Sequence, residues 1–191
     1  MILMRHAETV FNVVYGATRR DPGVHDPSLT ADGHAQAHHA AAALGATSIR
    51  RVIASPYRRT LQTADIIARA LGVPVAVEPL IRERAAFACD IGTPKSKLAR
   101  DWSAYEFHHL DEVWWADIEE PERSLQERCR RFCANIARMP DWPHIAVITH
   151  WGVIKALTGL RVKNCEGVRF DPTAPVPDGN RCIVVSPGDT C

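Results

Sequence analysis

The chain has 191 residues, of which 46 % are hydrophobic and 24 % are charged, and this composition excludes an intrinsically disordered protein. The 23 Lys and Arg residues nearly balance the 22 Asp and Glu residues, so the net charge of +1 gives no general attraction to nucleic acid or to anionic membranes. No apolar stretch is long enough for a transmembrane helix, and the N-terminal apolar run is too short for a signal peptide. We therefore expect one cytoplasmic domain over residues 1–191, with no nucleic-acid or membrane partner.

Short apolar runs bounded by turn residues predict five strands. The expected strands span residues 2–5, 51–54, 73–77, 145–149 and 182–185. A long loop is expected after the first of them, because Gly16, Pro22, Gly23 and Pro27 interrupt that segment. Residues 161–179 are expected to be irregular.

Helical periodicity and end signals predict four helices between these strands. Thr30 is the expected N-cap of a helix that ends at Gly45. Ser55 is the expected N-cap of the next helix, which has Pro56 at its first position and stops at Gly72. The remaining two helices are expected over residues 121–139 and 152–160.

Strands that alternate with helices predict an α/β fold, a three-layer α/β/α sandwich around a mostly parallel central sheet. Residues 84–118 do not fit this alternation. We expect them to form a cap-like insertion that covers one end of the sheet. Its tryptophans, Trp102, Trp114 and Trp115, suit either core packing or the packing of a lid.

The cysteines and histidines show no metal-binding pattern. None of the cysteines forms a CxxC pair, and no Cys/His spacing matches a zinc finger or ribbon. We therefore expect reduced thiols, no metal and no other cofactor. The six cysteines are Cys89, Cys129, Cys133, Cys165, Cys182 and Cys191.

Polar residues collect where three of the predicted strands end. Arg5 and His6 follow the first strand, Arg59 lies just after the second, and His150 follows the fourth. Ligands of open α/β sheets bind outside the carboxyl ends of the strands, so these residues are expected to converge on one crevice. Guanidinium groups and helix N-termini both favour anions. The sequence therefore predicts a phosphate site that contains histidines.

Five motifs, in order, resemble those of the histidine phosphatase superfamily, in its phosphoglycerate mutase-like branch 1. They are MRHAETVFN at residues 4–12, PSLTADGHAQA at 27–37, SPYRRTLQTA at 55–64, LIRE at 80–83 and ITHWG at 148–152. Two positions depart from the family pattern. Ala7 replaces a glycine, and Trp151 replaces a residue that is usually small, so that its ring is expected to narrow the mouth of the pocket or to provide a stacking platform.

The resemblance implies a role for each matching residue. His6 is the implied nucleophile that becomes phosphohistidine, and Arg5, Arg59 and His150 complete the phosphate pocket. Asn12 is implied as an auxiliary phosphate contact. Glu83 matches the proton donor of the mutase-like branch, and Trp151 is expected to line the substrate pocket.

The resemblance implies metal-independent hydrolysis of a small phosphate monoester, a phosphorylated metabolite, through a phosphohistidine intermediate. Such a mechanism needs a neutral His6, and we expect Arg5, Arg59 and a protonated His150 to supply the positive charge. Phosphoglycerate mutase-type phosphoryl transfer, a phosphohistidine-protein phosphatase and a catalytically silent phosphate-binding protein remain alternatives. The oligomeric state, monomer or homodimer, stays open.

Overall fold

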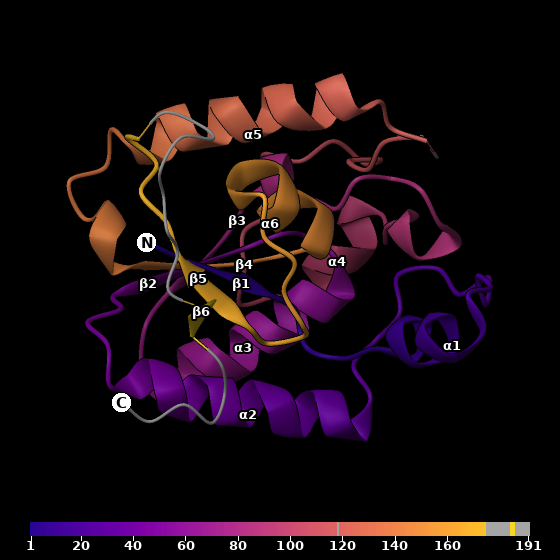
Figure 1. Ribbon diagram of the computed structural model, residues 1–191, viewed down its shortest axis with the longest axis horizontal. Coiled ribbons are helices and arrows are strands. Elements are labelled where there is room, and N and C mark those ends of the chain that lie inside the picture. Colours follow the sequence, from indigo (N-terminus) through magenta and orange to yellow (C-terminus); the bar gives the residue numbers. More distant parts are fainter. Residues whose placement is uncertain (118, 175–183, 186–191) are drawn as a thin grey trace.

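The computed structural model describes residues 1–117, 119–174 and 184–185, and in this part of the chain a six-stranded sheet runs through the middle of the molecule (Figure 1). The strand order is β3-β2-β4-β1-β5-β6. Pairing is parallel from β3 to β1 and antiparallel from β1 to β6, which confirms the mostly parallel sheet. The strands are β1 (Ile2–Arg5), β2 (Arg51–Ala54), β3 (Val75–Val77), β4 (Ile145–Thr149), β5 (Gly167–Arg169) and β6 (Val184–Val185).

Helices cover both faces of the sheet, which confirms the three-layer sandwich (Figure 1). The helices are α1 (Val10–Thr18), α2 (Ala31–Gly45), α3 (Arg58–Leu71), α4 (Lys95–Asp101), α5 (Glu122–Ile136) and α6 (Trp151–Thr158). Alternate residues of β1 point to opposite layers: Ile2 and Met4 pack with α2 and α3, whereas Leu3 packs with α5 and α6. None of the helices among the described residues has the length and apolarity needed to cross a membrane.

The ends of the elements differ from the sequence predictions in places. Strand β3 begins at Val75, not at residue 73, because the Val73 N–H donates to the Ala68 carbonyl at the end of α3 and Pro74 has no N–H. Helix α6 begins at Trp151, one residue earlier than predicted, and ends at Thr158. The residue that caps it, Gly159, has a φ of 73°, which favours glycine. Helix α5 begins after Pro121 as predicted but ends at Ile136.

Three elements were not predicted: helix α1, strand β5 and, within residues 84–118, helix α4. Helix α1 lies within the segment predicted as a loop, where Thr9 and Asn12 form a reciprocal capping box. Strand β5 lies in the segment predicted as irregular and pairs antiparallel with β1. Of the last predicted strand, β6 retains Val184–Val185, while residues 182–183 lie outside the described part.

The expected N-cap of α3 is wrong. Tyr57, not Ser55, occupies that position, and its side chain makes no capping hydrogen bond. The Ser55 N–H instead donates to the Ile148 carbonyl, which extends the pairing of β2 with β4, and the Ser55 hydroxyl contacts His150. At the other end, the helix stops at Gly72 with a φ of 67°, as expected.

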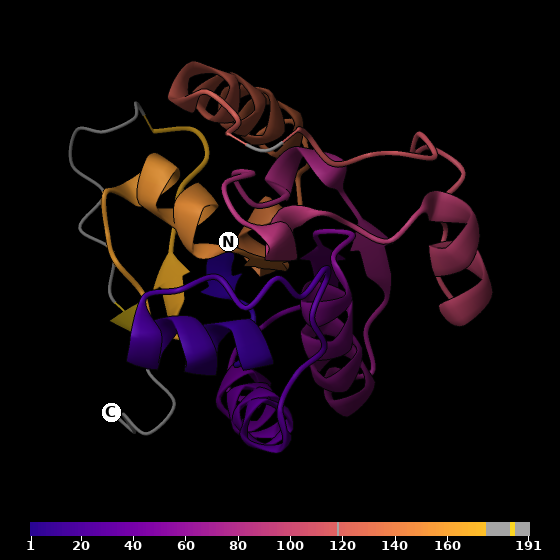
Figure 2. The ribbon, with the colours of Figure 1, turned by 90° about the vertical axis from the view of Figure 1, so that its right-hand side faces the viewer.

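The segment over residues 84–118 contains a 3₁₀ turn (Ala88–Asp90) and α4, which lies toward one edge of the molecule (Figure 2). Of its three tryptophans, Trp114 is 6 % exposed. The Trp114 ring packs edge-on against Tyr57, with 4.7 Å between the ring centroids, and its Nε1–H donates to the Thr93 carbonyl. Trp114 therefore belongs to the core, which was one of the two roles expected for it.

Candidate active site

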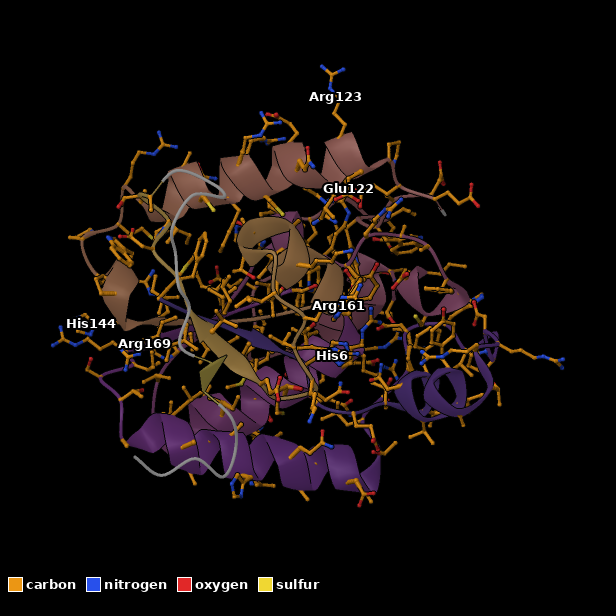
Figure 3. The ribbon with its side chains drawn as sticks, in the orientation of Figure 1. His6, Glu122, Arg123, His144, Arg161 and Arg169 are labelled. Carbon is orange, nitrogen blue, oxygen red and sulfur yellow. The ribbon has the colours of Figure 1, made fainter. Side chains whose placement is uncertain are left out.

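His6 lies directly after β1 and is held by backbone contacts on both sides. Its N–H donates to the Thr149 carbonyl at 2.9 Å, which aligns it with the end of β4. Its Nδ1 lies 2.7 Å from the Ala7 carbonyl oxygen, so Nδ1 carries the hydrogen and Nε2 keeps its lone pair. Burial, together with the charges of Arg59 and Arg5, holds the pKa of His6 well below its usual value. His6 is therefore a neutral imidazole at neutral pH. Figure 3 shows it inside the molecule, whereas Arg123 on α5 points outward.

His150 follows β4 and lies beside His6, with 5.3 Å between the ring centroids. It is fully buried, its Nε2 lies 2.9 Å from the Ser55 hydroxyl, and its buried Nδ1 has no partner among the described residues. Burial and the neighbouring Arg59 and His6 hold its pKa well below the usual value. The expectation of a protonated His150 is therefore wrong for the free protein.

Arg59 points into the protein and is 3 % exposed. Its Nη1 donates to the Cys89 carbonyl at 2.8 Å, its Nη2 donates to Asp90 Oδ1 at 3.2 Å, and its Cζ lies 4.2 Å from the centre of the Tyr57 ring. Asp26 lies 4.0 Å away on another side. These contacts fix the guanidinium and leave three of its five N–H donors unassigned.

Arg5 is the last residue of β1 and immediately precedes His6. Its Nη1 donates to the Val162 carbonyl at 3.1 Å, while its buried Nε has no partner in the described part of the chain. Its charge acts on both His6 and Glu83. Arg5 and His150 thus each present an unused buried polar atom, and such atoms are rare unless a ligand or water satisfies them.

Glu83 lies at the N-terminus of α6, next to His150. Both carboxylate oxygens accept from the Gly152 N–H, at 3.1 and 3.2 Å, and Oε1 also accepts from the Arg84 N–H. A Cβ at position 152 would collide with Glu83 Oε1, which explains the glycine there. Burial, assisted by the charge of Asp90, raises the pKa of Glu83 above its usual value. Glu83 is therefore suited to hold a proton.

A buried ion-pair network holds the backbone at Glu83. The Arg128 side chain forms a two-pronged contact with Glu120, Nε–Oε1 at 2.9 Å and Nη2–Oε2 at 2.8 Å. Arg128 also donates to the carbonyls of Leu80 and Glu83. Burial favours the neutral form of Glu120, but the hydrogen bonds and charge of Arg128 outweigh it and lower the pKa of Glu120. The Glu120 carboxylate is therefore ionised, and a second cation, Arg82, lies 3.3 Å from it.

Sequence analysis missed several residues that support the site. Asp26 and Asn164 come from loops and Asp90 from a 3₁₀ turn, and no periodicity marks them. Asn164 Nδ2 donates both to the His6 carbonyl at 3.0 Å and to Asn12 Oδ1 at 3.2 Å. Arg128 did carry a signal, since it stands within the apolar stripe of α5 and a charge at such a position is usually paired.

Asn12 and Trp151 lie near the site with other contacts already made. Asn12 Oδ1 accepts from the Thr9 N–H and hydroxyl within the capping box, so only its Nδ2 is left to donate. Trp151 is half-buried at the first turn of α6, with Lys155 Nζ 4.9 Å from the ring centre. The structure thus brings His6, His150, Arg5, Arg59 and Glu83 into one cluster, with Asn12 and Trp151 at its margin.

The other motif residues position the loop that carries His6. The Ala7 N–H donates to Thr63 Oγ1, and the Glu8 N–H donates to Gln36 Oε1. A Cβ at Gly33 would collide with the Glu8 carbonyl oxygen, so α2 can approach this loop only with glycine there. Among the described residues no three His, Cys, Asp or Glu side chains are grouped as metal ligands would be.

Comparisons with known proteins agree with this architecture. A chain named probable phosphoglycerate mutase GpmB from Yersinia enterocolitica is 43 % identical over 204 residues, covering 100 % of this chain and 93 % of the relative. A protein of the same name from Yersinia pestis is 29 % identical over 98 % of this chain and 92 % of the relative.

Solved structures share the fold. The mycobacterial glucosyl-3-phosphoglycerate phosphatase superposes with a TM-score of 0.62 at 23 % identity, covering 88 % of this chain and 87 % of that one. The ecdysone phosphate phosphatase of Bombyx mori superposes with a TM-score of 0.61 at 18 % identity, over 100 % and 93 % of the two chains. The model of the histidine phosphatase superfamily, branch 1, matches residues 1–172, and the chain belongs to that family.

Proposed function

We propose that the protein is a metal-independent phosphatase that hydrolyses a small phosphate monoester, a phosphorylated metabolite, through a phosphohistidine at His6. One observation carries the proposal: a neutral His6 has its Nε2 lone pair free, and its neighbours Arg5 and His150 each hold a buried polar atom that has no partner among the described residues. A neutral imidazole is nucleophilic, and unused donors near it suit the oxygens of a phosphoryl group.

In the first step, His6 Nε2 attacks the phosphorus atom and the bond from phosphorus to the ester oxygen breaks. Arg5 and Arg59 donate hydrogen bonds to the phosphoryl oxygens and stabilise their charge. When the Ser55 hydroxyl donates to His150 Nε2, the hydrogen of His150 lies on Nδ1 and is available to a third oxygen. A phosphoryl dianion would also favour protonation of this ring, which burial opposes in the free protein.

Glu83 serves as the proton donor in this mechanism. In the protonated form it gives its proton to the departing alkoxide. In the second step the Glu83 carboxylate takes a proton from water, whose oxygen attacks phosphorus and releases phosphate from His6. The raised pKa of Glu83 supports the first of these roles, because it extends the pH range in which the carboxyl is protonated.

Two residues beside the catalytic cluster, Asn12 and Trp151, would contact the substrate. Asn12 Nδ2 would add one donor to a phosphoryl oxygen, and the Trp151 ring would border the leaving group. Residues 84–118 would act as a cap-like insertion, since their Cys89 and Asp90 hold Arg59. Phosphoglycerate mutase-type transfer is the second candidate, because relatives with that name cover nearly the whole chain.

Hydrolysis of a panel of phosphorylated metabolites tests the proposal, with 3-phosphoglycerate included. We expect release of inorganic phosphate that survives exhaustive EDTA treatment and is inhibited by vanadate. Loss of activity in EDTA, restored by a divalent ion, would assign the reaction to a different mechanism. Interconversion of phosphoglycerates without net phosphate release would favour the mutase.

Replacement of the proton donor tests its role. Glu83→Gln should slow the hydrolysis of alkyl phosphates strongly but spare nitrophenyl phosphate, whose phenolate leaves with little help. Glu122→Gln, at an exposed carboxylate that pairs with Arg84, is the matched control and should leave both rates unchanged. Equal losses on both substrates in Glu83→Gln would mean that Glu83 is structural.

A further inference from the structure

Helix α1 is an apolar helix without a buried face. Its nine residues, VFNVVYGAT, carry no charge, yet none of them is buried, and Val10 and Val13 are 47 % and 49 % exposed. A surface helix normally turns its apolar residues toward the core and its polar residues toward water. The composition of α1 therefore fits a surface that another molecule covers.

Three aromatic rings form a platform between α1 and the segment over residues 84–118. Phe11 and Tyr15, one turn apart on α1, stack at 5.3 Å between centroids, and Phe87 lies 5.4 Å from Phe11 and 5.0 Å from Tyr15. All three side chains are half-buried, so part of each ring remains accessible. We call these three residues the aromatic platform.

Short chains of contacts connect both sides of the aromatic platform to the candidate active site. On the α1 side, Asn12 follows Phe11 and shares Asn164 with the His6 carbonyl. On the other side, the Phe87 N–H donates to Asp90 Oδ2, while Asp90 Oδ1 accepts from Arg59. Figure 2 shows α1 in the foreground of the molecule. Hydrogen bonds thus connect both sides of the platform to residues of the candidate active site.

Four arginines around the site already have carboxylate partners. Arg58 lies 4.0 Å from Asp101, Arg84 lies 3.3 Å from Glu122, and Arg82 pairs with the buried Glu120. Arg59 is likewise held by Asp90. These four cations are already partnered, and the platform offers ring faces and edges to the substrate, with the Arg19 guanidinium 5.8 Å from the centre of the Tyr15 ring.

We propose that the aromatic platform binds the alcohol part of the substrate, so that the enzyme prefers phosphate esters of aromatic or other apolar alcohols to those of small hydroxy acids. The proposal rests on the phosphatase function and adds its substrate class. The phosphoryl group enters the pocket at His6, and the organic group lies across Phe11, Tyr15 and Phe87. Burial of its apolar surface there contributes to binding.

The test compares 2-naphthyl phosphate, phenyl phosphate and 3-phosphoglycerate as substrates of the full chain. The two phenolic leaving groups need similar protonation, so their ratio of kcat/KM reports binding of the second ring. We expect this ratio to be about tenfold in favour of the naphthyl ester, at the usual free energy per buried apolar area. We expect 3-phosphoglycerate to be the poorest of the three.

Variants then assign the preference to the platform. Phe87→Ala and, separately, Phe11→Ala should each lower the naphthyl-to-phenyl ratio toward one while phenyl phosphate is still hydrolysed. Val113→Ser, which changes an apolar side chain that is 60 % exposed and outside the platform, is the control and should keep the wild-type ratio.

Each other outcome has a distinct meaning. Hydrolysis of none of the esters overturns both the phosphatase function and this inference. Equal rates for the naphthyl and phenyl esters, or a preference for 3-phosphoglycerate, overturn the inference alone. A wild-type dimer that dissociates in Phe87→Ala with an unchanged substrate ratio would assign the platform to a contact between two copies of the chain, and would also overturn it.

Discussion

Removal of the Arg128 guanidinium should destabilise the protein and should also disturb the positioning of Glu83 as proton donor. In Arg128→Ala the buried Glu120 carboxylate, whose side chain is 2 % exposed, loses both prongs of its principal partner. Breaking a buried ion pair from one side costs about 3–5 kcal/mol. Arg82 still lies 3.3 Å from Glu120 and is partly solvated, so we expect the lower end, about 3 kcal/mol.

That loss corresponds to a decrease in Tm of roughly 6–12 °C for a chain of this size. Chemical denaturation gives the free energy of unfolding directly. Arg130→Ala is the matched control, because Arg130 lies on the same helix and pairs with Glu127 while 65 % of its side chain is exposed. We expect that variant to lose less than about 1 kcal/mol.

The Arg128→Ala variant also tests the positioning of Glu83. Arg128 Nη2 donates to the Glu83 carbonyl at 3.1 Å, so its loss should slow alkyl phosphates about tenfold more than aryl phosphates, the value of one lost hydrogen bond. Arg128→Met combined with Glu120→Leu should recover the free energy of unfolding but should not restore the rate on alkyl phosphates relative to aryl phosphates. A cost below about 1 kcal/mol in Arg128→Ala, or equal losses on both ester classes, would refute the reasoning.

Three further predictions follow from the site. The pKa of His150 is lowered in the folded state, so the unfolded chain binds more protons and the free energy of unfolding decreases as the pH drops below about 6.5. His150→Gln should reduce this pH dependence by up to about 1.4 kcal/mol per pH unit, as measured by chemical denaturation from about pH 5.5 to 6.5. Substitution of an exposed histidine, His38→Gln, is the control. The pKa of Glu83 is raised, so kcat/KM for alkyl phosphates should decline as the pH rises through the pKa of Glu83. The pH–rate profile of Glu83→Gln should lack this decline. Trp151→Gly should change KM for bulky esters and leave the smallest esters nearly unaffected; equal loss on all esters would make Trp151 a packing residue.

The sheet and its two covering layers could be predicted from the sequence because burial on both faces leaves a continuous apolar run. Residues Ile145–Thr149 are buried throughout, and the strand has the predicted ends. Helix α1 could not be recognised in the same way. It buries no residue, and Gly16, Pro22 and Gly23 predict a loop there, so only the Thr9–Asn12 capping box marks its start.

The candidate site was predictable where strand ends determine it. His6 and His150 follow the paired strands β1 and β4, and parallel pairing brings them together. The charge state of His150 was not predictable, since it depends on burial and on nearby Arg59. The partners of Arg59 were missed because Asp26 and Asp90 come from distant loops that only the folded chain brings together.

Formation of a phosphoenzyme is the most direct test of the central claim. Brief incubation with a ³²P-labelled phosphate ester, followed by rapid denaturation, should give a labelled chain whose phosphate is acid-labile and alkali-stable, and peptide mapping should place the label on His6. His6→Ala should lose both the label and turnover, whereas His38→Gln should keep both. Wild-type turnover in His6→Ala, or a label on any other residue, would contradict the account.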